Sequence, residues 1–235
     1  MKYSRIMLKF SGEVLQGKEG DPIDFSVLDR LAGEIAALHQ QGVQIAVVIG
    51  GGNIWRYRDN SAESLPRVQS DFMGMMATVM NGVALHASLE RAKIPARVFS
   101  ALGGMDVVEP YVRAKVLHHL EKGRVVICVG GTGHPYFTTD SAAALRGLEL
   151  QCNILLKATK VDGVYDRDPV KDSSAQRYET IRFQEVLEKR LAFMDSTASS
   201  LCWEGGLEVL VFDLMKPGNL SAAVQGLPVG TRVHV

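Results

Sequence analysis

The chain has 235 residues, 46% of them hydrophobic, and its 26 Lys and Arg residues balance 26 Asp and Glu residues. This length and composition allow a sizeable core, built as one large α/β domain or as two closely joined lobes. A formal charge of zero excludes a global electrostatic attraction to nucleic acid or to an anionic membrane, so any specificity for an anion has to be local.

The first predicted strand, residues 6–8, is followed by Lys9-Phe10-Ser11-Gly12, which places a cation and then small residues near a strand end. Residues 12–18 match the beginning of a P-loop. However, Glu19 stands where a P-loop has the Ser or Thr that holds magnesium, and Gly20 and Pro22 follow where it has a helix. We therefore reject a P-loop at this position.

An amphipathic helix is predicted after Asp24, which serves as its N-cap, and it ends at Gly42. Its apolar face consists of Leu28, Leu31, Ile35 and Leu38. The second strand, residues 44–49, leads into Gly50-Gly51-Gly52, where a ligand can lie directly on the backbone. Arg56, one helical turn later, can reach such a ligand. The chain has no G-x-G-x-x-G fingerprint, which argues against a nicotinamide enzyme.

A long helix is predicted to begin at Asp71, with apolar residues on more than one face. These apolar residues are Met73, Met75, Met76, Val79, Met80 and Val83. Because a helix that is apolar on two sides is buried on both, and methionine packs adaptably, we interpret the second face as a subunit interface. Strands at residues 96–99 and 107–108 and a helix at residues 112–121 continue the alternation of β and α.

The segment that organises the chain is residues 130–140, which follow a buried strand at residues 125–129. A helix at residues 141–148 comes next, and Asp140 is predicted to cap it. In an open α/β sheet this junction lies at the carboxyl ends of the strands, where backbone N–H groups and a helix N-terminus favour anionic ligands. We interpret it as a site for a phosphate compound. The alternative is a tight turn without a ligand.

A strand at residues 153–156 is followed by Lys157, which supplies a second cation at the same edge of the predicted sheet. The remaining predicted elements are a surface loop at residues 167–176, helices at residues 183–190 and 196–204, a strand at residues 208–213, a break at Pro217-Gly218 and a closing strand at residues 232–235.

Three cysteines, Cys128, Cys152 and Cys202, are far apart and lie in apolar or helical contexts, so we expect buried, reduced thiols. No pair of histidines has the spacing of metal ligands, and no metal site held by the protein alone is expected. The N-terminal segment is too short for the apolar region of a signal peptide, and no run approaches membrane-spanning length. We expect a cytoplasmic protein.

Four motifs make the chain similar to the bacterial uridylate (UMP) kinases of the amino acid kinase fold. They are Lys9-Phe10-Ser11-Gly12, VIGGGN at residues 48–53, Met80-Asn81-Gly82 and KATKVDGV at residues 157–164. Together they span nearly the whole chain. The most specific segment, TGHPYFTTDSAA at residues 132–143, resembles a uridylate-reading loop.

The resemblance implies a three-layer α/β/α sandwich around a mainly parallel sheet, formed by a single domain of residues 1–235. It implies that the N-terminal half binds UMP, that the C-terminal half binds ATP, and that Mg²⁺ arrives as Mg-ATP. It also implies a homohexamer that GTP activates and UTP inhibits.

Phosphoryl transfer to an acceptor that is already a phosphate needs positioned cations more than proton movement. By resemblance the catalytic residues are Lys9, Arg56, Asp140 and Lys157. The two lysines flank the transferred group, Arg56 contacts phosphate, and Asp140 orients either the lysines or the magnesium of the nucleotide. Lys9 and Lys157 also have an ordinary alternative as surface lysines, and Asp140 as a helix cap.

The resemblance assigns further residues to the nucleotides. For ATP they are Lys9, Phe10, Ser11, Gly12, Gly52, Arg56, Thr159, Tyr165 and Asp168. For UMP they are Gly51, Asp71, Thr132, Gly133, His134, Pro135, Tyr136, Phe137, Thr138 and Thr139, with Asp71 accepting from the ribose hydroxyls. For the effector GTP they are His86, Arg97, Arg113 and Arg124.

The chain departs from the family pattern at Phe10, where leucine is usual, at Asp21-Pro22, and at Glu90 within an effector region that matches only in part. Two rival functions remain. One is an amino acid kinase that acts on a carboxylate, against which the uracil-type loop argues. The other is a nucleotide-binding protein without catalysis, against which the retention of Lys9, Asp140 and Lys157 argues.

Overall fold

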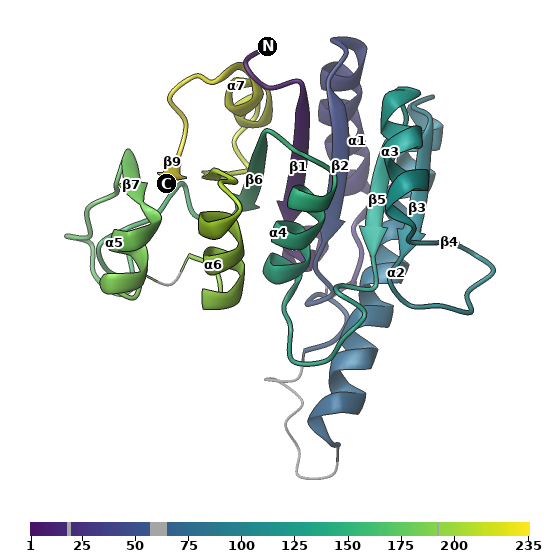
Figure 1. The fold of residues 1–235 in the computed structure, drawn as a ribbon, viewed down its shortest axis with the longest axis horizontal. Coiled ribbons are helices and arrows are strands. Elements are labelled where there is room, and N and C mark those ends of the chain that lie inside the picture. Colours follow the sequence, from purple (N-terminus) through teal and green to yellow (C-terminus); the bar gives the residue numbers. More distant parts are fainter. Residues whose placement is uncertain (18–19, 57–64, 192) are drawn as a thin grey trace.

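The computed structural model describes residues 1–17, 20–56, 65–191 and 193–235. Lys18 and Glu19, which bear on the excluded P-loop, lie outside the described residues. Within the described residues the chain forms a sheet of nine strands in the order β4-β3-β5-β2-β1-β6-β8-β9-β7 (Figure 1). Neighbouring strands are parallel, except that β8 and β9 are antiparallel. The strands are β1 (Arg5–Phe10), β2 (Gln44–Ile49), β3 (Ala96–Ser100), β4 (Glu109–Pro110), β5 (Val125–Val129), β6 (Ile154–Thr159), β7 (Thr180–Arg182), β8 (Val209–Asp213) and β9 (Thr231–His234).

Helices cover both faces of the sheet, and each face has its own cluster of buried apolar side chains. One face packs against α1 (Phe25–Gln40), α2 (Arg67–Arg91) and α7 (Asn219–Gln225). The other face packs against α3 (Arg113–Glu121), α4 (Thr139–Glu149), α5 (Phe183–Glu188) and α6 (Ser196–Glu204). A short 3-10 helix, η1 (Gly12–Leu15), follows β1. These three layers around a mainly parallel sheet confirm the predicted fold class.

Two of the strands that are buried on both faces have the predicted bounds, because a continuous apolar run is typical of the centre of a parallel sheet. The predicted ends of β1 and β6, residues 8 and 156, are wrong, since these strands continue through Lys9 to Phe10 and through Lys157 to Thr159. β2 and β5 begin and end where the sequence predicts, and every residue of β5 is buried. The first long helix is also confirmed: Asp24 caps α1 by accepting a hydrogen bond from the backbone N–H of Ser26 at 2.8 Å.

Other predicted bounds are wrong, and each has a local reason. Residues 107–108 lie in a turn, and the strand is β4, directly after them, where it pairs with β3. Neither β7 nor α7 is predicted, because one has only three residues and the other begins directly after Gly218. Asp140 does not cap α4. Thr138 does, since its hydroxyl oxygen accepts from the N–H groups of Asp140 (3.0 Å) and Ser141 (3.3 Å).

α2 begins at Arg67 and not at Asp71, and it runs for 25 residues. Its length and apolar composition would suffice to cross a membrane, contrary to the expectation from the sequence, but half of its most apolar stretch is buried inside the molecule. Burial of this kind is typical of a core helix in a globular protein. Its second apolar face is solvent-exposed in the single chain and consists of Phe72, Met76, Met80 and Val83.

α4 joins the two sides of the sheet. It leaves β5, packs against β2 and β1, and leads into β6 on the other side of β1. As a result the carboxyl ends of β1, β2, β5 and β6 lie at one edge, which is the lower edge in Figure 1. The loop between β5 and α4 and the first turns of α2 extend beyond that edge (Figure 1). Ligand sites in open α/β sheets occur at such an edge.

Candidate active site

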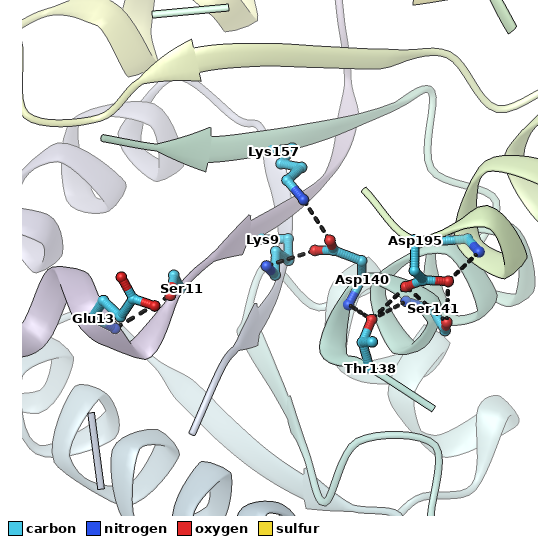
Figure 2. Close-up of polar contacts among 9 residues, drawn as sticks. Lys9, Ser11, Glu13, Thr138, Asp140, Ser141, Lys157 and Asp195 are labelled. Carbon is cyan, nitrogen blue, oxygen red and sulfur yellow. Dashed lines mark hydrogen bonds and ion pairs between the residues drawn. The ribbon is translucent and has the colours of Figure 1, made fainter. Parts of the chain in front are cut away.

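Two lysines and one aspartate form a buried charge cluster at this edge (Figure 2). Lys9 on β1 and Lys157 on β6 are register partners in adjacent parallel strands, so both side chains leave the same face of the sheet. Asp140, in the first turn of α4, lies between them. Lys9 Nζ is 2.6 Å from Asp140 Oδ1, and Lys157 Nζ donates a hydrogen bond to Asp140 Oδ2. The cluster therefore joins three elements that are distant in sequence.

The opposite charges in this cluster stabilise one another and so offset the cost of burying them. Burial alone would raise the pKa of Asp140, but the ammonium groups of Lys9 and Lys157 outweigh that effect and hold this pKa below its ordinary value. Burial also lowers the pKa of Lys157, and the attraction to Asp140 only partly offsets it. A buried charge is tolerated when it is paired in this way.

Lys9 Nζ forms an ion pair with Oδ1 of Asp140 at 2.6 Å, and Lys157 contacts the other carboxylate oxygen. An ammonium group has three donors, so Lys9 can contact Asp140 and still donate to a second acceptor. An anion with several oxygens, such as a phosphate, fits this donor set.

The glycine-rich turn after β2 is shaped by packing. A Cβ atom at Gly51 would lie 2.6 Å from the carbonyl oxygen of Gly74 on α2, and a Cβ atom at Gly52 would lie 2.9 Å from Arg56 Nε. A Cβ atom at Gly12 would lie 2.3 Å from Asn53 Oδ1. These glycines therefore let β1, β2 and α2 approach closely, which accounts for the turn without a ligand.

Arg56 follows a hydrogen-bonded turn at residues 52–54, and within the described residues no helix begins between β2 and α2. Its Nη2 atom forms an ion pair with Glu13 Oε1 at 2.6 Å, and its Nε atom donates to the carbonyl oxygen of Gly52 at 2.6 Å. The structure thus places Arg56 beside η1 and joins it to Glu13, a residue that the sequence did not single out.

The loop between β5 and α4 has an unusual backbone. Gly130, Gly131 and Gly133 adopt positive φ angles of 76°, 60° and 82°, and Tyr136 adopts a φ angle of 71°. The loop is fixed at its start by the hydrogen bond from Gly130 N–H to Thr78 Oγ1 at 2.8 Å. In its middle, Thr132 Oγ1 contacts His134 at 3.2 Å. The side chains of Tyr136 and Phe137 are exposed.

Asp71 joins this loop to α2. Its Oδ2 atom accepts from the backbone N–H of Tyr136 at 2.8 Å, and Arg67 Nε lies 2.8 Å from both carboxylate oxygens. The Arg67 guanidinium group also lies over the Tyr136 ring, 5.6 Å from its centroid. The residues that the resemblance assigns to UMP, from Gly51 to Thr139, are therefore brought together around the first turns of α2 and the loop.

The residues assigned to ATP fall into two groups. Thr159, Tyr165 and Asp168 line a cavity of about 510 Å³ beside β6, together with residues of the segment that follows α5. Tyr165 donates to Asp162 Oδ1 at 2.6 Å. Ser11, Gly12 and Gly52 lie instead near Lys9, at the end of β1 and β2. Phe10 is fully buried.

Only two of the four residues assigned to an effector lie in the same cavity. His86 and Arg97 line a cavity of about 460 Å³ between α2, β3 and β4. Arg124 lies outside it and contacts His119 Nδ1 at 3.1 Å. Burial, and then the charge of Arg124, lower the pKa of His119, and Arg97 acts on the same imidazole. Arg113 points elsewhere and donates to the carbonyl oxygen of Glu149 at 2.6 Å.

Sequence reasoning missed Asp195, which contacts Thr138 and Ser141 beside the cluster. The only local signal is that it precedes the predicted helix at residues 196–204, which marks a cap and not a site. Within the part of the chain that the structure describes, no group of three His, Cys, Asp or Glu side chains is placed to hold a metal ion. The cluster offers one carboxylate and two cations, a donor set that suits phosphate oxygens better than a bare metal.

Comparison with known proteins relates the whole chain to kinases. A model of the amino acid kinase family matches residues 4–213. The chain is similar to a solved structure of UMP kinase from Bacillus anthracis, with 32% identity and a TM-score of 0.96 over 100% of this chain and 97% of that one. It is 38% identical to UMP kinase from Ureaplasma parvum, with a TM-score of 0.94 and 100% of both chains covered. It is 28% identical to uridylate kinase from Archaeoglobus fulgidus, with a TM-score of 0.76 over 99% of this chain and 100% of that one.

Proposed function

Because the chain belongs to the amino acid kinase family, we propose that it transfers the γ-phosphate of Mg-ATP to UMP, which yields UDP and ADP. The observation that carries this proposal is the buried cluster of Lys9, Asp140 and Lys157 at the carboxyl edge of the sheet. The similarity of the complete chain to solved UMP kinases supports UMP as the acceptor.

The chemistry asked of the cluster is electrostatic. The acceptor oxygen of UMP already carries negative charge, so no general base is needed, and the main barrier is to bring two polyanions together in line. Lys9 and Lys157 neutralise the oxygens of the transferred group from two sides. Asp140 keeps the two ammonium groups in place and paired while no phosphate is bound. Preorganised charges of this kind act without reorganisation during the reaction.

We assign UMP to the N-terminal half, between Asp71 and the loop of residues 130–138, and ATP to the cavity beside β6 in the C-terminal half. The carboxylate of Asp71 lies where a ribose hydroxyl can replace Tyr136 N–H as its donor. The cavity of about 510 Å³ has the size of a typical nucleotide or cofactor pocket. Magnesium enters as part of the substrate Mg-ATP and is held by its phosphates. As for such enzymes generally, we propose that the protein acts in the cytoplasm.

A substrate panel tests the proposal. Purified protein with Mg-ATP is given UMP, CMP, AMP, aspartate or acetylglutamate, and ADP formation is measured. We expect UMP to be by far the best acceptor. ADP formation with a carboxylate and none with UMP would assign the chain to another amino acid kinase. No ADP with any acceptor, from protein that binds ATP, would indicate a nucleotide-binding protein without catalysis.

We also propose that the chain forms a homo-oligomer, which by resemblance is a hexamer. The exposed face of α2, formed by Phe72, Met76, Met80 and Val83, is a continuous apolar strip that a monomer would leave in water. Light scattering at assay concentration measures the mass. A monomeric species would contradict the assembly, and Met76→Glu/Met80→Glu should dissociate it.

We propose that GTP activates and UTP inhibits the enzyme, as the resemblance implies. The cavity lined by His86 and Arg97 offers a cation near the subunit surface, but Glu90 lies 3.6 Å from His86 Nδ1 and Glu109 lies 4.0 Å from Arg97 Nε. Activation by GTP should disappear in Arg97→Ala/Arg124→Ala while basal turnover persists, since the coupling between two sites is typically about 1 to 3 kcal/mol. Arg113→Ala is the matched control, because Arg113 is held at Glu149. An undiminished response in the double variant would exclude this effector site.

A further inference from the structure

Asp195 connects the two helix N-termini that meet beside the charge cluster (Figure 2). It is the N-cap of α6, where its Oδ1 atom accepts from the backbone N–H of Ala198 at 2.8 Å. The same carboxylate accepts from Ser141 Oγ at 3.0 and 3.1 Å and from the hydroxyl group of Thr138. An ordinary helix cap serves its own helix only. Asp195 therefore does more than cap α6.

The hydrogen bond from Thr138 to Asp195 sets the direction of the Thr138 hydroxyl group. Because that hydroxyl donates its proton to Asp195, its lone pairs face the N–H groups of Asp140 (3.0 Å) and Ser141 (3.3 Å). These two N–H groups form the first turn of α4, which carries the Asp140 carboxylate. The position of Asp140 between the two lysines thus depends on the carboxylate of Asp195 through one hydroxyl group.

Asp195 also acts on the cluster through its charge. Burial has the largest effect on the pKa of Lys157. The charged groups that also affect this pKa are Asp140 from α4, Lys9 from β1 and Asp195 from the start of α6. The negative charge of Asp195 opposes the effect of burial and of Lys9 and favours the protonated form of Lys157. A site that binds polyphosphate needs this lysine protonated.

We propose that Asp195 is a positioning residue for phosphoryl transfer, which through Thr138 and Ser141 holds the first turn of α4 so that Asp140 stays between Lys9 and Lys157. This role rests on the proposed function. It differs from a purely structural role, in which Asp195 would only stabilise α6. The two roles separate because asparagine is as good an N-cap as aspartate. Asp195→Asn keeps the cap of α6 and removes the charge that holds Thr138 and Ser141.

Steady-state kinetics and hydrogen exchange of Asp195→Asn test the proposal. We expect kcat to fall about tenfold, since small displacements of catalytic groups have effects of this order or larger. The KM for ATP should stay within about threefold of wild type, because Asp195 lines no part of the cavity beside β6. The alkaline limb of the kcat profile should move to lower pH, since loss of the Asp195 charge further lowers the pKa of Lys157.

Hydrogen exchange followed by mass spectrometry measures how firmly the first turn of α4 is held, and this measurement does not depend on enzyme activity. In Asp195→Asn the amides of residues 140–142 should exchange faster than in wild type, while those of α6 should not change. Asp24→Asn is the matched control, because Asp24 caps α1 in the same manner and should leave kcat and the exchange of α4 at wild-type values. Asp195→Ser provides a second variant, because serine also caps a helix but has no carboxylate to hold Thr138 and Ser141.

The proposal is overturned by wild-type kcat in Asp195→Asn, or by a reduced kcat with unchanged exchange at residues 140–142. If Asp195→Asn does not fold, Asp195→Ser decides by the same two readouts. A wild-type protein that makes no UDP would remove the proposed function, and exchange alone would then decide the role of Asp195: faster exchange in α4 supports it and unchanged exchange refutes it.

Discussion

The charge cluster and the loop of residues 130–138 are neighbours, but the protein holds them in opposite ways. Lys9 and Lys157 are 8% and 7% exposed, lie within central strands and are fixed by Asp140 from a third element. Tyr136 and Phe137 of the loop are 68% and 49% exposed, and the loop is fixed at a few points by hydrogen bonds to its backbone.

In the proposed function, this difference separates the residues that carry the chemistry from those that recognise the substrate. The cluster is built into the core, where packing on both sides keeps its charges in one arrangement and the low local dielectric makes them effective. The loop lies at the surface and owes its shape to glycines with positive φ angles, so its side chains can change without disturbing the sheet. We expect changes in the cluster to lower kcat and changes in the loop to raise the KM for UMP.

Lys157→Met should have the largest effect on activity. We expect kcat to fall at least about 10³-fold, the upper range for loss of one preorganised electrostatic contact. Lys160→Met is the matched control, because Lys160 is exposed in the turn after β6, and its kcat should equal that of wild type. A kcat within tenfold of wild type for Lys157→Met would show that one lysine is enough and would remove the cluster from the centre of the mechanism.

The same variant should keep its stability. Burial lowers the pKa of Lys157 below its ordinary value of 10.5, so the charged lysine costs stability at neutral pH, and this cost disappears only as the pH rises above that value. Methionine has no such cost, and Asp140 keeps Lys9 as a partner. Thermal unfolding of Lys157→Met should therefore occur at or above the wild-type temperature.

Asp140→Asn should come next, with kcat lowered by at least about tenfold and a loss of stability that Lys157→Met does not show. Removing the carboxylate leaves two buried ammonium groups without their partner, and breaking a buried pair in this way costs about 3 kcal/mol. Urea unfolding at pH 7 measures this difference from wild type. An unchanged free energy of unfolding would show that the cluster contributes nothing to the fold.

The pH dependence of this difference follows from the pKa of Asp140. Because its folded-state pKa lies below the ordinary value of 3.8, the ion pairs stabilise the wild type fully above that value and are lost as the pH falls through the folded-state pKa. Asp140→Asn lacks this contribution at every pH. The gap in stability between the two proteins should therefore be constant near neutrality and should narrow below about pH 4.

Asp71→Asn should affect recognition and leave the chemistry intact. We expect the KM for UMP to rise about tenfold and kcat to stay within about threefold, because a ribose contact acts on binding. The amide oxygen of asparagine still accepts from Tyr136 N–H, so the loop should keep its place. An equal loss of stability in Asp71→Asn and Asp140→Asn would show that both carboxylates are structural.

The sequence predicts best what is local and apolar. β2 and β5 are almost continuous apolar runs, and such a run is typical of a central parallel strand that is buried on both faces. The cap of α4 shows the limit, because Thr138, Asp140 and Ser141 are all residue types that cap helices. Asp140 forms ion pairs with the two lysines, and Thr138 is the N-cap of α4. That choice depends on contacts between elements, and the local sequence does not contain them.

The same limit explains the site residues that sequence reasoning missed. Lys9, Asp140 and Lys157 come together because each stands at a predicted strand or helix end on one edge of the sheet. Glu13 and Asp195 carry no such pattern. Glu13 is in a short 3-10 helix and is identified only by its ion pair with Arg56, and Asp195 only by its bonds to a helix far away in sequence.

Tyr136→Gly should have the smallest effect and is the most direct test of the separation between loop and cluster. Tyr136 has a φ angle of 71°, a conformation that costs a residue other than glycine about 1 to 2 kcal/mol. Glycine removes that strain but adds about 0.4 to 1 kcal/mol of conformational freedom to the unfolded chain. It also removes the ring below Arg67. Stability should therefore change little.

Lys93→Gly is the matched control, since Lys93 has a φ angle of 60° at the end of α2, away from the loop. Both variants should unfold within about 1 kcal/mol of wild type. Only Tyr136→Gly should raise the KM for UMP, by about threefold, as expected for an exposed side chain that closes over a ligand. Its kcat should equal that of wild type, because no bond joins Tyr136 to Lys9, Asp140 or Lys157 among the described contacts. A fall in kcat as large as in Asp140→Asn would mean that the loop positions the charges, and the division between a rigid cluster and a permissive loop would be wrong.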